Sequence, residues 1–236
     1  IKQGHLHVSE IESDIDITNL YFKKGGKPFY IISGEFQFSR YDNALWEQEI
    51  LKMKAGGINT IATYTFWNHH ERKKGEWTFN GDCDLNRFIS LCSKNHMFVI
   101  LRMGPYSHGE AKNGGFPDWI WKRKDKRTNS EWYLKEVETM YAKYYEQVKE
   151  FLYQGNAGTI IGIQLENEYT KDESHIKMLK KIACKIGFKV PIYTVTAWSG
   201  GIPGDYSTVP LFGTYPEAPW SHGIKPLPNE NRFKIN

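Results

Sequence analysis

The chain has 236 residues, of which 40% are hydrophobic and 25% charged, with a net charge of +4 from 31 basic and 27 acidic residues. This length suits one large domain or two small ones, and the composition is too apolar for wholesale disorder. The balanced charge argues against a nucleic-acid partner, and no apolar run reaches the roughly 18 residues of a membrane span. The three cysteines, an odd and low number, exclude a disulfide framework as the basis of the fold.

Short apolar runs alternate along the chain with segments of helical period. The runs predict strands buried on both faces, because a strand with one wet face alternates polar and apolar residues. The first run follows the turn Gly25-Gly26-Lys27-Pro28. The predicted strands are residues 29–32, 58–64, 97–101, 159–165 and 191–195, with a shorter candidate at 209–212.

Helices are predicted between these strands, where apolar residues recur three and four positions apart. Short polar residues favour helix starts and glycine favours helix ends, so these residue types set the expected boundaries. The expected boundary residues are Asp42 or Asn43 as the first cap, Gly56-Gly57 as the first stop, Asp84 as the second cap, Thr128 with Glu131 as a capping box, and Gly187 as the last stop.

Buried strands that are each followed by a helix predict an α/β fold with a parallel sheet, either doubly wound or closed as a (β/α)8 barrel. No Gly-x-Gly-x-x-Gly follows the first strand and no phosphate-binding loop is present, which leaves the doubly wound alternative without its fingerprint. Polar and aromatic residues gather after the strands, where barrel enzymes build their sites. They are Tyr64, Trp67, Asn68, His69, Tyr106, His108, Glu110, Glu166, Asn167, Glu168 and Trp198.

A whole barrel takes roughly 250 residues or more. The pattern here accounts for five strand–helix units and a candidate sixth strand, and residues 216–236 contain four prolines and little periodicity. We therefore expect residues 1–236 to form one domain, a (β/α)8 barrel that lacks its C-terminal strands. The first strand would then lack a neighbour on one side.

The strongest chemical signal is Gln164-Leu165-Glu166-Asn167-Glu168-Tyr169, where two carboxylates flank an amide at the end of an apolar strand. A negative charge there costs free energy unless it has a partner or a task. A carboxylic acid in a partly apolar pocket has a raised pKa and can give its proton to a leaving oxygen. A solvated strand end is the structural alternative. Glycoside hydrolysis with retention needs two carboxyls roughly 5–5.5 Å apart, so the partner of such an acid should come from another strand.

Six segments of the chain together resemble glycoside hydrolase family 35, the β-galactosidases. They occur in the order of the family, from about residue 20 to residue 200, and the specificity lies in the set rather than in any one segment. The segments are Ile31-Ile32-Ser33-Gly34, Lys54-Ala55-Gly56-Gly57 after Trp46, Thr63-Tyr64-Thr65-Phe66-Trp67-Asn68 with Glu71, Leu101-Arg102-Met103-Gly104-Pro105-Tyr106, Gly114-Gly115-Phe116-Pro117-Asp118-Trp119, and Gln164-Leu165-Glu166-Asn167-Glu168-Tyr169.

The resemblance implies a retaining glycosidase that hydrolyses terminal β-galactosyl residues. It implies that Glu168 is the acid/base and that Asn167 binds the sugar 2-hydroxyl. Tyr64 matches a tyrosine that contacts galactose, and Glu110 matches a glutamate that binds sugar hydroxyls. No metal or organic cofactor is implied, and the expected partner is a β-galactoside or oligosaccharide rather than nucleic acid or a membrane.

Three departures from the family concern the sugar specificity rather than the membership. Ala111 follows Glu110 where the family commonly has Trp, Asn156-Ala157-Gly158-Thr159 replaces Gly-Gly-Pro, and Glu35-Phe36-Gln37-Phe38 stands where Ser-x-His-Tyr is common. A β-glycosidase of the same clan with another sugar specificity therefore stays open.

The family nucleophile is a glutamate at the end of the seventh strand, and no residue here matches it. Glu217 follows the candidate sixth strand, and Glu230 lies in a polar, proline-flanked stretch. We expect the nucleophile beyond Asn236 in a longer parent chain, so that residues 1–236 alone would be inactive. A non-catalytic carbohydrate-binding barrel is the alternative from another class. Family enzymes are mostly exported or lysosomal, which suggests a secreted, periplasmic or lysosome-like location.

Other conspicuous residues have plainer interpretations. His69-His70 beside Glu71 lacks the rest of a zinc-site spacing, and a structural role at the rim is favoured. The run Lys122–Arg127 is predicted to be a solvated loop. Trp198, Tyr215 and Trp220 suit either sugar stacking or ordinary burial.

Overall fold

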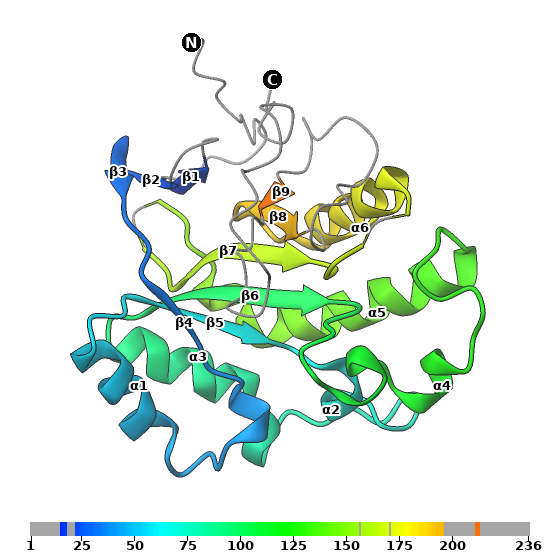
Figure 1. Ribbon diagram of the computed structural model, residues 1–236, viewed down its shortest axis with the longest axis horizontal. Coiled ribbons are helices and arrows are strands. Elements are labelled where there is room, and N and C mark those ends of the chain that lie inside the picture. The colour runs from blue at the N-terminus through cyan, green and yellow to red at the C-terminus, as the bar shows by residue number, and fades with distance from the viewer. Residues whose placement is uncertain (1–14, 18–21, 156, 170, 196–210, 213–236) are drawn as a thin grey trace, which may run out of the picture.

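A parallel sheet of six strands, in the order β4-β5-β6-β7-β8-β9, forms the centre of the molecule. The computed structural model describes residues 15–17, 22–155, 157–169, 171–195 and 211–212 (Figure 1). Parallel neighbours in unbroken chain order form a barrel wall, whereas a doubly wound sheet reverses its order partway. The predicted (β/α)8 fold class is thus confirmed, with β4 at the edge of the described sheet. Its strands are β4 (Ser33–Glu35), β5 (Thr60–Tyr64), β6 (Phe98–Gly104), β7 (Ile160–Leu165), β8 (Ile192–Val195) and β9 (Leu211–Phe212).

Helices cover the outer face of this sheet, with α1 packed on α3, α3 on α5 and α5 on α6. In Figure 1 the strands β6 and β7 point towards the side on which α2 and α4 lie. The helices are α1 (Trp46–Ala55), α2 (Trp67–His70), α3 (Leu85–Lys94), α4 (Asp118–Trp121), α5 (Glu131–Val148) and α6 (Glu173–Ile186), with short 3-10 helices at Phe38–Arg40, Gly81–Cys83, Lys112–Gly115 and Lys149–Phe151.

A small antiparallel sheet of β1 (Ile15–Ile17), β2 (Phe22–Lys24) and β3 (Lys27–Phe29) lies beside the amino end of β6. Phe29 packs edge-on against Phe98, the first residue of β6, with ring centroids 5.3 Å apart. The Lys24 ammonium lies 4.7 Å from the centroid of the Phe98 ring. The sequence patterns predicted none of this sheet.

The prediction of a buried strand over residues 29–32 is wrong. Phe29 ends β3, the first barrel strand begins only at Ser33, and Tyr30 and Ile32 between them are 82% and 46% exposed. The Asn59 side chain bridges the gap: its Oδ1 accepts from the Ile32 amide at 3.0 Å and its Nδ2 donates to the Tyr30 carbonyl at 2.9 Å. The apolar run therefore connects two sheets instead of lying inside one.

Three of the predicted helix boundaries are confirmed, the first of them at Gly56, which directly follows the last residue of α1. The Asp84 side chain accepts a hydrogen bond from the Arg87 amide at 2.9 Å, which satisfies one of the free amides at the start of α3. Gly187 ends α6 in a left-handed conformation, with φ of 125°.

Two other predicted caps are wrong because a neighbouring residue takes the role. Ser130, not Thr128, caps α5, and its hydroxyl accepts from the Tyr133 amide at 3.3 Å. Thr128 instead accepts from the Ser130 amide at 3.2 Å in the turn before the helix. Asp42 and Asn43 both lie before the N-cap position of α1, which is Leu45 and makes no side-chain cap bond; Asp42 Oδ1 instead accepts from the Ala44 amide in the preceding turn.

A row of polar side chains crosses the barrel interior near the carboxyl ends of the strands. In the register of the sheet Tyr64 pairs with Arg102, Arg102 with Gln164, and Gln164 with Tyr193. The inward-facing residues of a barrel stack in such layers. Here the layer is polar and lies directly beneath the residues that follow β7.

Candidate functional site

The chain turns sharply where β7 ends, and the turn uses two left-handed residues. Glu166 has φ of 58° and Glu168 φ of 51°, conformations that cost a residue with a Cβ atom about 1–2 kcal/mol each. Backbone bonds hold the turn: the Glu166 amide donates to the Gly104 carbonyl at 2.7 Å and the Glu168 amide to the Val195 carbonyl at 3.2 Å. Backbone strain of this kind clusters at functional sites.

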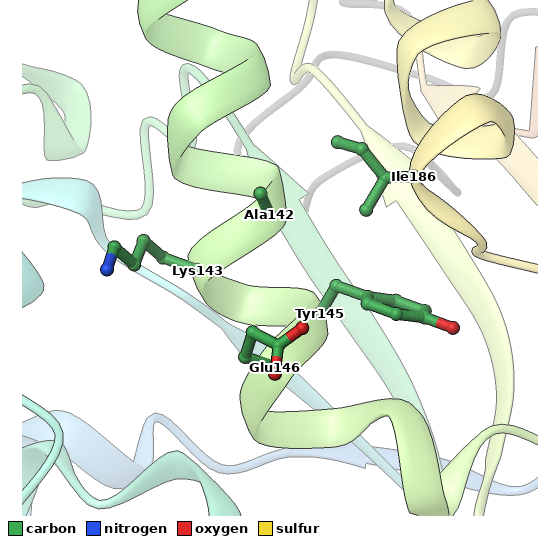
Figure 2. Close-up of a pocket in the computed structure, with 5 residues that line it drawn as sticks. All are labelled: Ala142, Lys143, Tyr145, Glu146 and Ile186. Carbon is green, nitrogen blue, oxygen red and sulfur yellow. The ribbon is translucent and has the colours of Figure 1, made fainter.

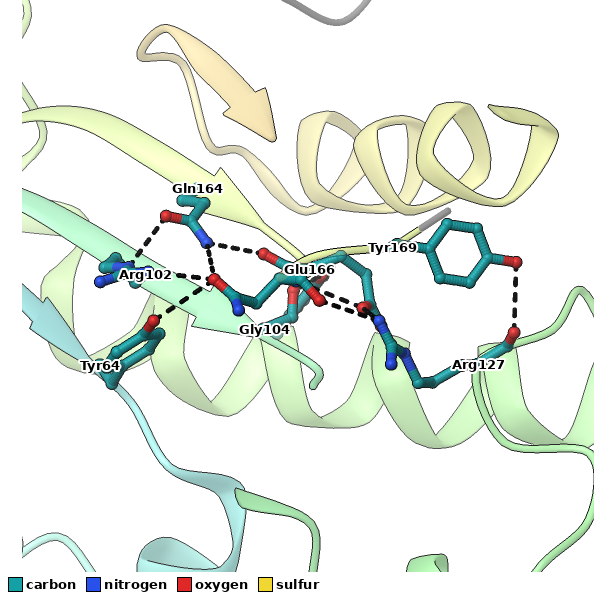
Figure 3. Close-up of polar contacts among 9 residues, drawn as sticks. Tyr64, Arg102, Gly104, Arg127, Gln164, Glu166 and Tyr169 are labelled. Atoms are coloured by element: carbon teal, nitrogen blue, oxygen red, sulfur yellow. Dashed lines mark hydrogen bonds and ion pairs between the residues drawn. The ribbon is translucent and has the colours of Figure 1, made fainter. Parts of the chain in front are cut away.

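Asn167 lies between the two glutamates and directs its side chain into the barrel, where its Oδ1 accepts three hydrogen bonds. They come from Arg102 Nη2 at 3.0 Å, Gln164 Nε2 at 3.1 Å and the Tyr64 hydroxyl at 3.4 Å. Figure 3 shows the guanidinium of Arg102 between Gln164 and Tyr64. The structure therefore brings Tyr64 and Asn167, two of the predicted site residues, into direct contact.

Glu166 points to the other side and is fully buried beneath Arg127 (Figure 3). Arg127 Nε and Nη2 donate to Glu166 Oε2 at 3.0 and 2.7 Å, and Nη2 also donates to the Asn167 carbonyl at 2.9 Å. The guanidinium lies 3.9 Å from the centroid of the Tyr106 ring. Arg127 thus neutralises the buried Glu166 carboxylate and stabilises the strained turn through its bond to the Asn167 carbonyl.

Arg127 also shows that the prediction of a solvated loop over residues 122–127 fails at its last member. Its side chain is only 21% exposed. Nothing near Glu166 in the sequence is basic, so the residues alone gave that carboxylate no partner. The partner comes from 39 positions earlier in the chain.

Burial governs the titration of the groups around this turn. It raises the pKa of the Glu166 carboxyl, and the charge and hydrogen bonds of Arg127 oppose that rise. Burial also raises the pKa of the Tyr106 phenol, and the charges of Glu166 and Glu168 raise it further. Both carboxylates therefore lie within electrostatic reach of one tyrosine ring.

Glu168 is half-buried and directly follows Asn167 in the turn after β7. Its neighbour Glu166 is fully buried and paired. Glu168 therefore keeps part of its surface exposed, whereas the carboxylate of Glu166 is occupied by its ion pair with Arg127. Such a pair can supply a single proton donor and acceptor beside the amide of Asn167.

Glu110 lies outside this network. Its side chain is 86% exposed, and its carboxylate lies 3.9 Å from His108 Nδ1. The loop that carries it nevertheless passes beside the site, because a Cβ atom on Gly109 would lie 3.1 Å from the Tyr64 ring. Arg40 donates to the Gly109 carbonyl and holds the loop at that point.

Arg102 is the polar residue that the sequence interpretation missed. It belongs to one of the segments that resemble the family, but the resemblance assigned it no role. The detectable signal is an arginine inside a strand whose neighbours Leu101 and Met103 are fully buried, since such a charge needs partners. Its partners are Glu35, which pairs with Nη1, and Gln164, whose Oε1 lies 2.9 Å from Nε.

His70 and Glu71 have the structural role that was favoured. His70 is fully buried with Nδ1 3.1 Å from the Thr78 carbonyl, and burial lowers its pKa to about 4. Glu71 accepts from Trp67 Nε1 and from the Gly75 amide, both at 2.6 Å. Within the residues described, no three His, Cys, Asp or Glu side chains gather as metal ligands would.

A pocket of about 380 Å³ lies elsewhere, between α5 and α6 (Figure 2). Because α5 returns antiparallel to the strands, its later residues lie towards the amino ends of the sheet. The pocket therefore lies far along the helix layer from the turn after β7. Its lining residues are Ala142, Lys143, Tyr145, Glu146 and Ile186.

Several residues named from the sequence lie outside the described part of the chain. They are the two glutamates considered as nucleophiles and the three aromatic residues considered for sugar stacking, namely Glu217, Glu230, Trp198, Tyr215 and Trp220. No helix among the described residues is long and apolar enough to cross a membrane.

Solved structures similar to this chain define its class of fold. An exo-β-1,4-mannosidase from Opitutaceae bacterium strain TAV5 aligns with a TM-score of 0.56 at 14% identity, covering 82% of this chain and 36% of that one. The catalytic domain of a mannanase from Streptomyces sp. SirexAA-E aligns with a TM-score of 0.52 at 12% identity, covering 78% and 52%. The class is the (β/α)8 barrel found in glycoside hydrolases.

The sequence comparisons then identify the family, because the profile of glycosyl hydrolases family 35 matches residues 21–200. The β-galactosidase of Canis lupus familiaris is 34% identical over 220 residues, which cover 88% of this chain and 33% of that protein. Beta-galactosidase 17 of Arabidopsis thaliana is 37% identical over 216 residues, 88% of this chain and 30% of that protein. The chain belongs to glycosyl hydrolases family 35, and it spans about a third of the length of these relatives.

Proposed function

We propose that residues 1–236 belong to the catalytic barrel of a retaining β-galactosidase. The observation that carries this proposal is the turn after β7, where the half-buried Glu168 follows an Asn167 whose side chain is bonded to Tyr64. The relatives in the family are named β-galactosidases, which supports galactose as the sugar.

In the proposed reaction Glu168 gives its proton to the glycosidic oxygen as the bond to the anomeric carbon breaks. A second glutamate, from a later strand of the barrel, attacks that carbon and forms a covalent glycosyl intermediate. Glu168, now a carboxylate, takes a proton from water, and the hydroxyl oxygen displaces the second glutamate. The sugar leaves with its original anomeric configuration.

The environments of the two glutamates support this division of roles. Glu166 is buried and paired with Arg127, so its carboxylate is occupied as a structural anion. Glu168 is half-buried beside the site, where a sugar oxygen can approach it. In the proposed site Asn167 binds the 2-hydroxyl, and Tyr64 and Glu110 contact other parts of the galactose ring.

A different sugar specificity is the second candidate, and it is favoured by the surroundings of Glu110. The Glu110 side chain is exposed, and Ala111 follows it at the position where the family commonly has Trp. The family fold would then be retained with another β-glycoside as substrate. The expected setting in either case is a secreted, periplasmic or lysosome-like compartment.

The test is hydrolysis of a panel of aryl β-glycosides by the full-length protein, purified free of host glycosidases. We expect turnover of the β-galactoside well above that of the glucoside, mannoside and xyloside, with β-galactose as the first sugar seen by proton NMR. Preference for another sugar would select the second candidate. Binding of galactose without turnover of any glycoside would instead indicate a carbohydrate-binding barrel.

A further inference from the structure

Arg102 occupies the centre of the polar row and contacts a residue on every neighbouring strand of the described sheet. It lies between its register partners, Tyr64 on β5 and Gln164 on β7, and its guanidinium carbon lies 3.8 Å from the centroid of the Tyr64 ring. On β4, two strands away from β6, Glu35 forms an ion pair with Arg102 Nη1. Its side chain is 13% exposed, so these contacts form largely out of water.

A guanidinium has five N–H donors and no acceptor, and this decides how the amides around Arg102 must be turned. Nε lies 2.9 Å from the Gln164 side chain and Nη2 lies 3.0 Å from that of Asn167. If either amide were flipped, an NH₂ group would face an N–H donor inside the barrel, and both would lose a hydrogen bond. Arg102 therefore fixes both amides with their oxygens towards itself.

The two fixed amides then act on one another. With its Oε1 on Arg102, Gln164 must direct Nε2 the other way, where it donates to Asn167 Oδ1 at 3.1 Å and to the Glu166 carbonyl at 2.8 Å. The Tyr64 hydroxyl adds a third donor to Asn167 Oδ1 at 3.4 Å. The oxygen of Asn167 is thus fully used, and its Nδ2 makes no hydrogen bond to any described residue.

We propose that Arg102 is a positioning residue, which sets the side-chain amide of Asn167 so that its Nδ2 donates to the 2-hydroxyl of the bound sugar. The proposal rests on the function proposed above, since it takes the 2-hydroxyl as the group that Asn167 meets. A sugar oxygen can accept from a correctly turned amide without any rearrangement of the site. A freely rotating amide would present its oxygen part of the time and lose that bond.

The kinetic test compares aryl β-galactoside with aryl 2-deoxy-β-galactoside in the full-length protein. In Arg102→Ala we expect kcat/KM on the galactoside to fall about 10–100-fold, the worth of a hydrogen bond that strengthens at the transition state, and to fall less than about 3-fold on the 2-deoxy substrate. Adding Asn167→Ala should cause little further loss. Equal losses on both substrates, or additive losses in the double variant, would overturn the proposal.

The conservative variant separates positioning from charge. In Arg102→Lys a single ammonium keeps the charge beside Glu35 and cannot hold both amides in one plane, so we expect the 2-hydroxyl-specific loss to persist. Full rescue by lysine would contradict a role for the guanidinium fork. The control is Arg87→Ala on α3, which removes an arginine bonded to Asn43 on the outer layer and should leave the ratio of the two substrates unchanged.

A second readout needs no turnover, so it tests whether Arg102 fixes the Asn167 amide even if the protein hydrolyses no β-galactoside. With ¹⁵N-asparagine labelling, Asn167→Asp assigns the side-chain NH₂ resonance of Asn167. We expect one sharp pair of signals in the wild type, and broadened or doubled signals in Arg102→Ala as the amide samples both orientations. A single unshifted pair in Arg102→Ala would show that the amide is held without Arg102.

Discussion

The turn after β7 and the loop after β6 both carry a glutamate expected at the sugar, and they hold it in different ways. Both glutamates, Glu168 and Glu110, have left-handed backbones, with φ of 51° and 49°. Around Glu168 the chain is tied by Arg127 and by backbone bonds to two neighbouring strands. The Glu110 side chain is 86% exposed.

This difference teaches that an unusual backbone conformation does not by itself mark a preorganised group. Preorganisation requires that burial and hydrogen bonds leave a side chain one arrangement, as Arg102 and Gln164 do for Asn167. Catalysis gains most when the reacting groups are fixed before the substrate arrives. This contrast supports the proposal that the chemistry takes place at the end of β7 and that the loop after β6 adds contacts to the sugar.

The largest effect is expected from Glu168→Gln, which removes the proton donor. Positioned acid–base catalysis is worth about 10²–10⁴-fold, and we expect a loss of that size in kcat/KM for galactosides with poor leaving groups. Activated aryl galactosides, which need little protonation, should lose far less. Glu166→Gln is the matched control, because it should not change the dependence on the leaving group. Equal losses on both kinds of substrate in Glu168→Gln would reject the assignment.

Loss of Arg127 should have the largest effect on folding. Arg127→Ala leaves the Glu166 carboxylate buried without its partner, which costs about 3–5 kcal/mol in the free energy of unfolding. Chemical denaturation measures this, with Lys124→Ala in the same exposed loop as the control, and Glu166→Gln added to Arg127→Ala should recover part of the loss. A cost no greater than that of Lys124→Ala would show that the pair does not stabilise the turn.

The same variant has a definite pH dependence. Burial raises the pKa of Glu166 in the folded protein, so the folded state holds this proton more tightly than the unfolded state and stability from this group falls as pH rises. Without Arg127 the pKa rises further. The destabilisation by Arg127→Ala should therefore be smallest in acid, where Glu166 is protonated in both folded proteins, and should grow as the pH rises through the folded-state pKa of Glu166 in the wild type, which lies above the ordinary value of 4.5. If the difference in unfolding free energy between the wild type and Arg127→Ala stayed constant or shrank as the pH rose, the predicted direction of the pH dependence would be wrong.

Gly114→Ala tests how firmly the far end of the loop after β6 is packed. A Cβ atom on Gly114 would lie 2.0 Å from a Tyr106 ring carbon, and the residue has φ of 63°. Backbone strain and overpacking together predict a loss of about 2–4 kcal/mol. Gly75→Ala has similar backbone strain, with φ of 85°, and open space around the Cβ position, so it should lose about half as much. Equal losses of stability in Gly114→Ala and Gly75→Ala would mean that the loop moves to make room for the added Cβ atom.

The smallest effect on stability is expected at Glu110, because its side chain lies in solvent. Glu110→Gln should leave the unfolding midpoint unchanged and lower kcat/KM on β-galactosides about 10–100-fold, the worth of a charged hydrogen bond. Glu150→Gln, an exposed glutamate near the end of α5, is the control for an unspecific loss of charge. Unchanged kinetics in Glu110→Gln would remove this residue from the site.

The strands were predictable from sequence because runs buried on both faces leave little ambiguity: all six residues of β7 are buried, as expected. The apolar side chains of Tyr30 and Ile32 led to the wrong prediction of a buried strand over residues 29–32, because hydrophobicity does not show which neighbour will cover a side chain. Helix caps shifted by a few residues because several polar residues compete at each start, as Thr128 and Ser130 do.

Asn167 and Glu168 could be proposed as site residues from the sequence because they stand together in a segment that resembles the family, and their roles stay predictions. Arg127 could not be, because nothing in a run of basic residues distinguishes the one that turns inward. Its partner Glu166 lies 39 positions away. Arg102 could be predicted only in part. A charge in a buried strand indicates that it has a partner, but the sequence does not show which residue the partner is.

The central claim is that Tyr64, Asn167 and Glu168 form one sugar site at the end of β7. The most direct test is a crystal structure of the full-length protein with galactose. We predict galactose O2 within hydrogen-bond distance of Asn167 Nδ2, its O1 facing the Glu168 carboxyl, and Tyr64 against the ring. Galactose bound away from these three residues, or a Glu168 carboxyl turned from the anomeric carbon, would contradict the account.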